Sequence, residues 1–237
     1  DESDLDNLKY PLILQPKLDG IRCCILNGKA VSRKLKPIPN RHVRNILEKV
    51  VRTDNSLIDG ELILRNNKTF NEIQSAIMSE AGNPDFIYVC FDCITNNWEE
   101  TYYYRQVNLR HSFMKLDCIE FLNSQIIISK KELLEWEQYC LSDGHEGIIL
   151  RRLDQPYKFG RSTLKEGALM KFKRFTDSEA MILSSNEQMM NNNSLELDEL
   201  GYSKRSSAQD NLIPTGLLGS WVVQDCNPES KFYNQIF

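Results

Sequence analysis

The chain has 237 residues, of which 41% are hydrophobic and 26% are charged. This composition supplies a buried core for one large domain or two smaller ones and excludes a mainly disordered chain. The apolar runs are only a few residues long and the chain opens on the acidic stretch DESDLD, so we expect neither a membrane span nor a signal peptide. Seven cysteines without a secretory signal indicate free thiols in an intracellular, reducing compartment.

The formal net charge of −4 argues against a nucleic-acid partner, but the basic residues are unevenly distributed. Residues 9–49 contain ten lysines or arginines against two acids, and residues 144–174 contain eight against three. Because a local positive field attracts phosphate groups whatever the net charge, these two stretches are interpreted as two walls of one anion-binding cleft. Ordinary solvated faces are the alternative, and the charges alone leave both interpretations open.

The first part of the chain predicts short strands and one helix. Strands are expected over residues 12–14, 23–26, 30–31 and 57–64. Asn27 and Gly28 form a hairpin signal between the second and third of these strands. From Asn40 the apolar residues recur at helical spacing up to Val51, which predicts an amphipathic helix of about a dozen residues behind an asparagine cap.

Two capping boxes predict two further helices. Thr69 with Glu72 opens a helix near residues 70–80, and Ser129 with Glu132 opens one near 130–141. Buried strands are expected over residues 87–91, 126–128 and 148–151. Because strands and helices are intermixed in this order, the sequence predicts an α+β fold with antiparallel sheets.

The composition changes after Phe175. Residues 186–216 are rich in asparagine and acidic residues, which predicts a long mobile loop. Strands are expected on either side of it, over residues 180–183 and 220–223, in a second and smaller β domain. The chain stops within the strand-like KFYNQIF, so we expect a fragment of a longer parent, with domains over residues 1–174 and 175–237.

The segment KLDGIR, residues 17–22, lies between two expected strands and carries the first chemical signal. The amine of Lys17 next to an aspartate, a glycine and an arginine suits a nucleophile that attacks a phosphoryl group. Gly20 permits a close approach of the backbone, and Arg22 is a bidentate phosphate donor. A surface turn remains the alternative interpretation of this segment alone.

Further motifs follow in a fixed order. They are SRKLKPIPN at 32–40, IDGEL at 58–62, VCFDC at 89–93, DGHEGIILR at 143–151 and LMKFKRF at 169–175. The series resembles the motifs of covalent nucleotidyltransferases. SRxxKPIPN together with KFGRSTLKEG, residues 158–167, resembles ATP-dependent DNA ligases, above all small virus-encoded ligases of minimal architecture. The resemblance extends over about residues 10–225.

The resemblance implies both a fold and a reaction. The fold is a nucleotidyltransferase domain of ATP-grasp-like antiparallel sheets with helices over residues 1–174, then a partial oligonucleotide-binding (OB) fold over 175–237 with a DNA-contacting loop at about 186–218. Lys17 would attack the α-phosphate of ATP, form lysyl-AMP and release pyrophosphate. The AMP would then activate the 5′-phosphate of nicked duplex DNA for attack by the 3′-hydroxyl. We expect a monomer that acts inside a cell. This expectation includes a virus-encoded protein that acts in its host cell.

The nucleophile must lose a proton, because an unperturbed lysine amine with a pKa of about 10.4 is charged at pH 7. Lys171 and Lys173 lie two apart on an expected strand and face the same side. By the resemblance they would hold the α-phosphate and lower the pKa of Lys17. Mg²⁺ would be held by Glu146 with Asp59 or Glu61.

The resemblance assigns the remaining site residues to nucleotide or DNA. On the nucleotide, Glu61 would bind the ribose, Phe91 would stack on adenine, Arg22 would contact a phosphate, and Gln15 and Pro16 would line the adenine pocket through their backbone. The DNA contacts would be Asp19, Arg33, Lys158, Arg161, Tyr202, Lys204 and Arg205. Taken singly, Phe91 is more often a core residue and Glu146 a solvated carboxylate.

Other functions remain open. An RNA ligase or an mRNA capping guanylyltransferase shares the lysine and several motifs, although SRxxKPIPN favours a DNA ligase. A truncated, non-catalytic nick-binding module is the alternative from another class, because the family's last basic motif would lie beyond Phe237. Without that motif, the first step should be slow while sealing of a pre-adenylylated nick survives. Cys90 and Cys93 form a lone CxxC whose side chains should face opposite sides of a strand, which disfavours a zinc site.

Overall fold

The computed structural model describes residues 2–50, 57–66, 69–95, 97–110, 116–163, 165–175, 177–197, 201, 203–206, 208–230 and 232–237. The chain divides into two compact units, Asp1–Arg174 and Phe175–Phe237. Within the described ranges, no helix combines the length and the apolar composition needed to cross a bilayer. All seven cysteines are free thiols.

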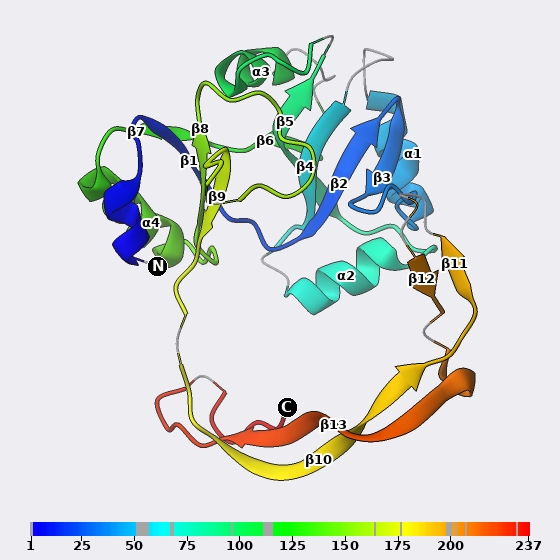
Figure 1. Ribbon diagram of the computed structural model, residues 1–237. Helices are drawn as coiled ribbons and strands as arrows, with labels where there is room; N and C mark the ends of the chain where they lie inside the picture. The colour runs from blue at the N-terminus through cyan, green and yellow to red at the C-terminus, as the bar shows by residue number, and fades with distance from the viewer. Residues whose placement is uncertain are drawn as a thin grey trace. The chain divides into compact units, whose positions relative to one another are not determined.

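The first unit contains a four-stranded antiparallel sheet, here called sheet A, in the order β7-β1-β8-β9 (Figure 1). Its strands are β7 (Gln125–Ile127), β1 (Leu12–Pro16), β8 (Ile148–Arg152) and β9 (Leu169–Phe172). One face packs on α4 (Lys130–Ser142) through a core that includes Leu12, Leu14, Ile148, Leu150 and Leu133. Because side chains alternate along a strand, Gln15, Ile149, Arg151 and Lys171 belong to the opposite face.

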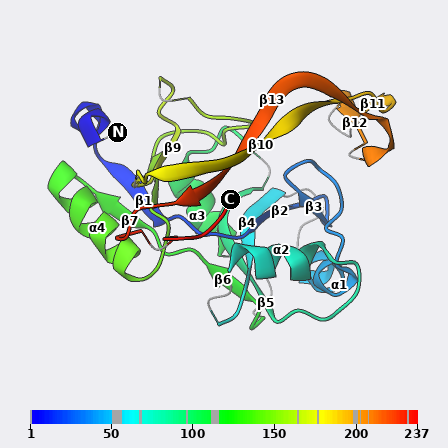
Figure 2. The same cartoon turned by 90° about the horizontal axis from the view of Figure 1, so that it is seen from below.

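A five-stranded sheet, here called sheet B, has the order β3-β2-β4-β5-β6. Its strands are β3 (Lys29–Ser32), β2 (Ile21–Leu26), β4 (Leu57–Leu64), β5 (Phe86–Ile94) and β6 (Ile119–Phe121). Only the β5/β6 pair is parallel. One face buries Cys23, Ile25, Ile58 and Leu62 against α1 (Arg41–Val50) and α2 (Phe70–Met78), which lie beside each other in Figure 2. The other face carries Arg22, Cys24, Asp59 and Glu61, which are neighbours in the β2/β4 register.

The capped helices form where the sequence predicts them. Asn40 Oδ1 accepts the Val43 N–H at 3.0 Å and caps α1. Thr69 and Glu72 form a complete capping box at the start of α2, and Ser129 accepts the Glu132 N–H at 3.3 Å at the start of α4. The intermixed helices and mainly antiparallel sheets expected from the sequence are confirmed, with β5/β6 as the parallel exception among the described strands.

One helix, α3 (Tyr102–Leu109), has no counterpart in the sequence prediction. Its buried stripe consists of Tyr102, Arg105 and Leu109, whereas Tyr103 and Tyr104 are exposed. The stripe has helical spacing, but a buried arginine and exposed aromatic residues disguise the apolar periodicity. Two short 3-10 helices, Glu2–Asn7 and Gln209–Asn211, complete the helical elements of the described residues.

A β-bulge in sheet B corrects the expectation for the two cysteines of the CxxC segment. Asp59 pairs with Asp92 and Gly60 pairs with Cys90, so that Phe91 is the extra residue of β5. The bulge changes the alternation, and Cys90 and Cys93 both point into the same core instead of to opposite sides. The prediction of opposite orientations was therefore wrong.

The second unit is built on a long antiparallel ribbon of β10 (Ala180–Asn191) and β13 (Leu212–Asp225) (Figure 1). A second hairpin pairs β11 (Leu195–Leu197) with β12 (Ser203–Arg205). The strands expected over 180–183 and 220–223 are confirmed, whereas the long loop expected over 186–216 is wrong. Nearly every side chain of β10 is exposed, so backbone pairing without an alternating apolar pattern holds this ribbon. The described residues of this unit form two two-stranded sheets, and the OB fold stays a prediction.

Candidate active site

Lys17 is the first residue after β1, and its backbone is fixed to the start of β8. Its N–H donates to the Gly147 carbonyl oxygen at 2.9 Å. Gly147 has to be a glycine, because a Cβ there would lie 2.3 Å from the Phe172 carbonyl oxygen. This close packing brings the Lys17 side chain to Glu146, the neighbour of that glycine.

Glu146 holds two lysines at once. Its Oε2 is paired with Lys17 Nζ, and its Oε1 lies 3.2 Å from Lys173 Nζ. The hydrogen bond from Lys17, followed by that from Lys173, lowers the pKa of the Glu146 carboxyl. The expected third member, Lys171, is exposed on β9 opposite Ile149 and makes no ion pair with any described residue. The structure thus joins two of the three predicted lysines through one carboxylate.

Asp59 on β4 is buried and already bound by protein groups. The Arg22 guanidinium donates to both carboxylate oxygens, from Nε at 2.9 Å and from Nη2 at 2.6 Å. The Tyr157 hydroxyl donates to Oδ2 at 2.7 Å, and the Cys24 thiol lies 3.4 Å from Oδ1. Burial, followed by the charge of Asp59, raises the pKa of Cys24 to about 12. Asp59 therefore orients Arg22 rather than offering free oxygens to a cation.

Glu61 lies two residues after Asp59 on the same sheet face, opposite Arg22 in the β2/β4 register. Burial first, and the negative charge of Asp59 second, raise the pKa of the Glu61 carboxyl to about 7. No described residue makes a hydrogen bond with this carboxylate. A half-buried carboxyl of this kind can donate or accept a hydrogen bond near neutral pH.

Phe91 is half-buried at the bulge of β5, and its position is fixed through its backbone. Its carbonyl oxygen accepts from the Tyr102 hydroxyl at 2.9 Å and from Gln106 Nε2 at 2.6 Å. Gln15 is engaged through its side chain, which donates to the Tyr102 hydroxyl at 2.7 Å and to Ser124 Oγ at 2.9 Å. Pro16 pairs with Ile148 across the β1/β8 ladder.

The residues predicted to contact DNA are mostly exposed. Asp19, Arg33 and Arg161 are exposed, and Lys158 Nζ lies 2.7 Å from Glu166 Oε1. In the second unit, Lys204 is exposed on β12, and Arg205 donates to the Asn193 carbonyl oxygen. Tyr202 lies outside the described residues.

The metal prediction can be tested against the donor chemistry. Within the described parts of the chain, no three His, Cys, Asp or Glu side chains gather as metal ligands. Among the described residues, Asp59 is bound by Arg22 and Tyr157, Glu61 has no hydrogen-bond partner, and Glu146 is paired with Lys17 and Lys173. Mg²⁺ prefers carboxylates together with substrate phosphates, so Glu146 and Glu61 fit such an ion and Asp59 does not.

Several residues of this region were missed at the sequence level. Arg105 and Arg151 form ion pairs with Asp92, and Tyr157 donates a hydrogen bond to Asp59. Tyr157 directly precedes KFGRSTLKEG and Asp92 directly follows Phe91, so their closeness to recognised motifs was the available signal. Arg151 is the last residue of the motif DGHEGIILR, which was the available signal, whereas Arg105 on α3 carried none.

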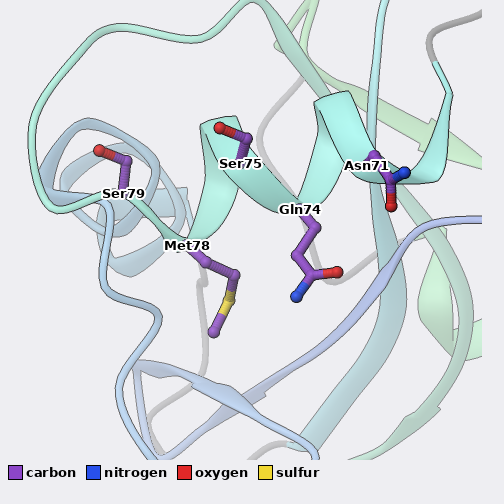
Figure 3. A pocket seen from close by; sticks show the side chains of 5 residues that line it. All are labelled: Asn71, Gln74, Ser75, Met78 and Ser79. Atoms are coloured by element: carbon purple, nitrogen blue, oxygen red, sulfur yellow. The ribbon is translucent and has the colours of Figure 1, made fainter. Parts of the chain in front are cut away.

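A surface hollow elsewhere in the first unit carries no comparable chemistry. Figure 3 shows its lining side chains, which all come from α2 and its C-cap: Asn71, Gln74, Ser75, Met78 and Ser79. These side chains are uncharged and exposed. The hollow therefore contains no charged side chain that could bind a phosphate or activate its serines.

Comparisons with known proteins agree with the motif series. The chain is 27% identical over 169 residues to "Probable DNA ligase" of Dictyoglomus turgidum, a match that covers 62% of this chain and only 29% of that protein. Two crystal structures of Chlorella virus DNA ligase-adenylate are similar, at 27% and 29% identity and TM-scores of 0.64 and 0.65. These matches cover 98% of this chain and 79% and 76% of those chains. The family model for the ATP-dependent DNA ligase domain matches residues 2–173, so the chain belongs to the ATP-dependent DNA ligase family.

Proposed function

We propose that this chain seals 3′-hydroxyl/5′-phosphate nicks in duplex DNA through a covalent lysyl-AMP intermediate. The observation that carries the proposal is the arrangement at the end of β1, where Glu146 binds both Lys17 and Lys173. The Lys17 amine extends from a fixed backbone position, is paired with a carboxylate and lies near a second cation. This arrangement suits nucleophilic attack on a phosphate. The likeness to a solved ligase-adenylate at 29% identity supports the same chemistry.

In the first step, Lys17 Nζ forms a bond to the α-phosphorus of ATP as the bond to pyrophosphate breaks. Glu146 Oε2 lies on that amine and takes the proton that the ammonium must lose. Lys173, with Lys171, stabilises negative charge on the α-phosphate oxygens. Mg²⁺ would be held by Glu61, and by Glu146 once this carboxyl has passed its proton to solvent, and would neutralise further phosphate charge.

The nucleotide lies between the polar faces of sheets A and B. Glu61 binds the ribose and Phe91 stacks on adenine, while Gln15 and Pro16 line the base pocket. Arg22, held by both oxygens of Asp59, presents its remaining N–H groups to a phosphate. These roles use the free carboxylate of Glu61 and the fixed backbone of Phe91.

Nick recognition uses the exposed cations. Arg33, Lys158 and Arg161 bind the 5′-phosphate, and Asp19, Tyr202, Lys204 and Arg205 contact the DNA. The second unit, as part of an OB domain, binds the duplex. We propose that the chain acts as a monomer.

The decisive test is transfer of a radiolabel from α-labelled ATP to the protein, followed on a denaturing gel. We expect a labelled band with ATP, which forms slowly with residues 1–237 alone and faster when the family's last motif is added, none with GTP or NAD, and none in Lys17→Ala. Lys131→Ala is the matched control, because Lys131 is an exposed lysine of α4 paired only with Glu135. Label from GTP would instead favour a capping guanylyltransferase.

A second assay separates ligase from binding module. Nicked duplexes with deoxyribose or ribose on either side of the nick are incubated with ATP and with a pre-adenylylated 5′-phosphate. Sealing of the all-DNA nick supports a DNA ligase, and sealing only of RNA strands supports an RNA ligase. Nick-specific gel shifts without label or sealing would contradict the proposal in favour of a non-catalytic module.

A further inference from the structure

Arg151 on β8 joins the two polar sheet faces. Its side chain is 12% exposed. Its Nε donates to Gln15 Oε1 at 3.0 Å, and its Nη1 donates to Asp92 Oδ2 at 3.2 Å. Gln15 belongs to sheet A and Asp92 to sheet B, so one guanidinium fixes a distance across the nucleotide site.

The same guanidinium lies against two aromatic rings. Its central carbon is 5.4 Å from the Phe91 ring centroid and 5.0 Å from the Tyr102 ring centroid. Cations are attracted to the electron-rich faces of aromatic rings at such distances. The Tyr102 hydroxyl in turn donates to the Phe91 carbonyl oxygen at 2.9 Å. The ring of Phe91 is therefore held by Arg151 and its backbone by Tyr102.

Arg151 is not needed to balance the charge of Asp92. Arg105 already donates to both carboxylate oxygens of this fully buried aspartate, from Nε at 2.7 Å and from Nη2 at 3.1 Å. Arg105 is also tied to the chain through the Glu100 and Gln155 carbonyl oxygens, at 2.6 and 3.0 Å. One guanidinium thus satisfies Asp92 structurally, and the second, Arg151, is directed toward Gln15 and Phe91.

We propose that Arg151 is a positioning residue for recognition of the adenine base, acting by holding the Phe91 ring and the Gln15 side chain in place. This inference rests on the proposed function, because it assigns the base-binding part of the same site. Arg151 does not contact the reacting atoms, since its hydrogen bonds go to Gln15 and Asp92. Its loss should therefore weaken nucleotide binding and leave the chemical step intact.

The first variant is Arg151→Lys, which keeps a positive charge but loses the planar fork that bonds Gln15 and Asp92 together. We expect the KM for ATP in lysyl-AMP formation to rise about tenfold, with kcat changed less than about twofold and the pH profile of kcat unmoved. Arg152→Lys is the matched control. Arg152 is the next residue of β8, and its guanidinium pairs with Asp154 at 2.7 Å instead of with the site.

The discriminating measurement is a double-mutant cycle with Phe91→Leu, which removes the aromatic ring. In the Phe91→Leu background, Arg151→Lys should change the KM for ATP by less than about twofold, because the ring it positions is gone. A purely structural arginine would give the same tenfold change in both backgrounds. Equal changes would overturn the inference.

Gln15→Leu keeps the experiment informative if Arg151→Lys does not fold. It removes the acceptor of Arg151 Nε without altering the Asp92 ion pairs, and we expect a threefold to tenfold rise in the KM for ATP. An unchanged KM in a folded Gln15→Leu protein would also overturn the inference. A wild-type protein that takes no label from ATP would overturn the proposed function together with this inference. If the wild-type protein is labelled normally but Arg151→Lys raises the KM for ATP by the same factor with and without Phe91→Leu, only the role of Arg151 is overturned.

Discussion

Lys17 and Glu146 form a side-chain ion pair that connects the end of β1 with the start of β8. The second oxygen of Glu146 binds Lys173, so the proposed nucleophile and a proposed phosphate-binding cation share one carboxylate. Glu146 balances the charge of Lys17. For Lys17 to attack ATP as proposed, this ion pair must break or Lys17 must pass its proton to Glu146. We therefore predict that the proton of Lys17 leaves through this ion pair.

Glu146→Gln should slow lysyl-AMP formation by at least about 100-fold, because the amide keeps the shape but cannot accept the proton. Single-turnover labelling with α-labelled ATP measures this rate. Glu135→Gln is the control, since Glu135 pairs only with exposed Lys131 on α4. A rate within threefold of wild type would show that the proton leaves by another path.

Asp59→Asn tests whether this aspartate binds a metal or orients Arg22. The hydrogen bonds of Arg22 to both Asp59 oxygens would lose their charge assistance, and lysyl-AMP formation should fall about tenfold. Raising Mg²⁺ about tenfold above its saturating level should not restore the rate, because Arg22 and Tyr157 already bind the Asp59 oxygens. Recovery of activity at high Mg²⁺ would contradict this assignment.

Local sequence signals identified the capped elements because each cap is made by neighbours in the chain. Thr69 with Glu72 and Asn40 with Val43 are three residues apart, so the sequence alone contains both partners. Part of the ribbon, residues 186–191 of β10 and 212–216 of β13, was misread as part of a loop for the opposite reason. Its strands are held by pairing between residues far apart in sequence, and exposed side chains leave no alternation to detect.

The candidate site likewise combines residues found from local motifs with residues that only the fold brings together. Lys17, Glu61 and Glu146 lie in recognisable motifs, and the structure adds which of them touch one another. The partners Tyr157 and Arg151 come from segments distant from Asp59 and Asp92, and only tertiary folding brings them together. A β-bulge at Phe91 likewise depends on how β4 pairs with β5, which no local pattern reports.

Asn40→Ala should destabilise the first unit by about 2 to 3 kcal/mol. Asn40 is fully buried; its Oδ1 caps α1, and its Nδ2 lies 3.1 Å from the Ser79 carbonyl oxygen and 3.2 Å from that of Ala81, just after α2. Urea unfolding measures the loss of stability. Asn71→Ala is the control, because Asn71 is exposed on α2. Equal midpoints for Asn40→Ala and Asn71→Ala would refute the role of Asn40 in linking the two helices.

Glu61 should make stability depend on pH, because its pKa is raised from 4.5 to about 7 in the folded protein, chiefly by burial. The folded state then binds more protons than the unfolded state between these values, so its stability falls as the pH rises from about 5 to 7. Glu61→Gln removes the ionisable group. At pH 8 its free energy of unfolding, measured with urea, should exceed that of the wild type by about 2 kcal/mol, and at pH 4.5 the two should be nearly equal. Parallel stability curves for the two proteins from pH 4.5 to 8 would mean that water or a cation already solvates this carboxylate.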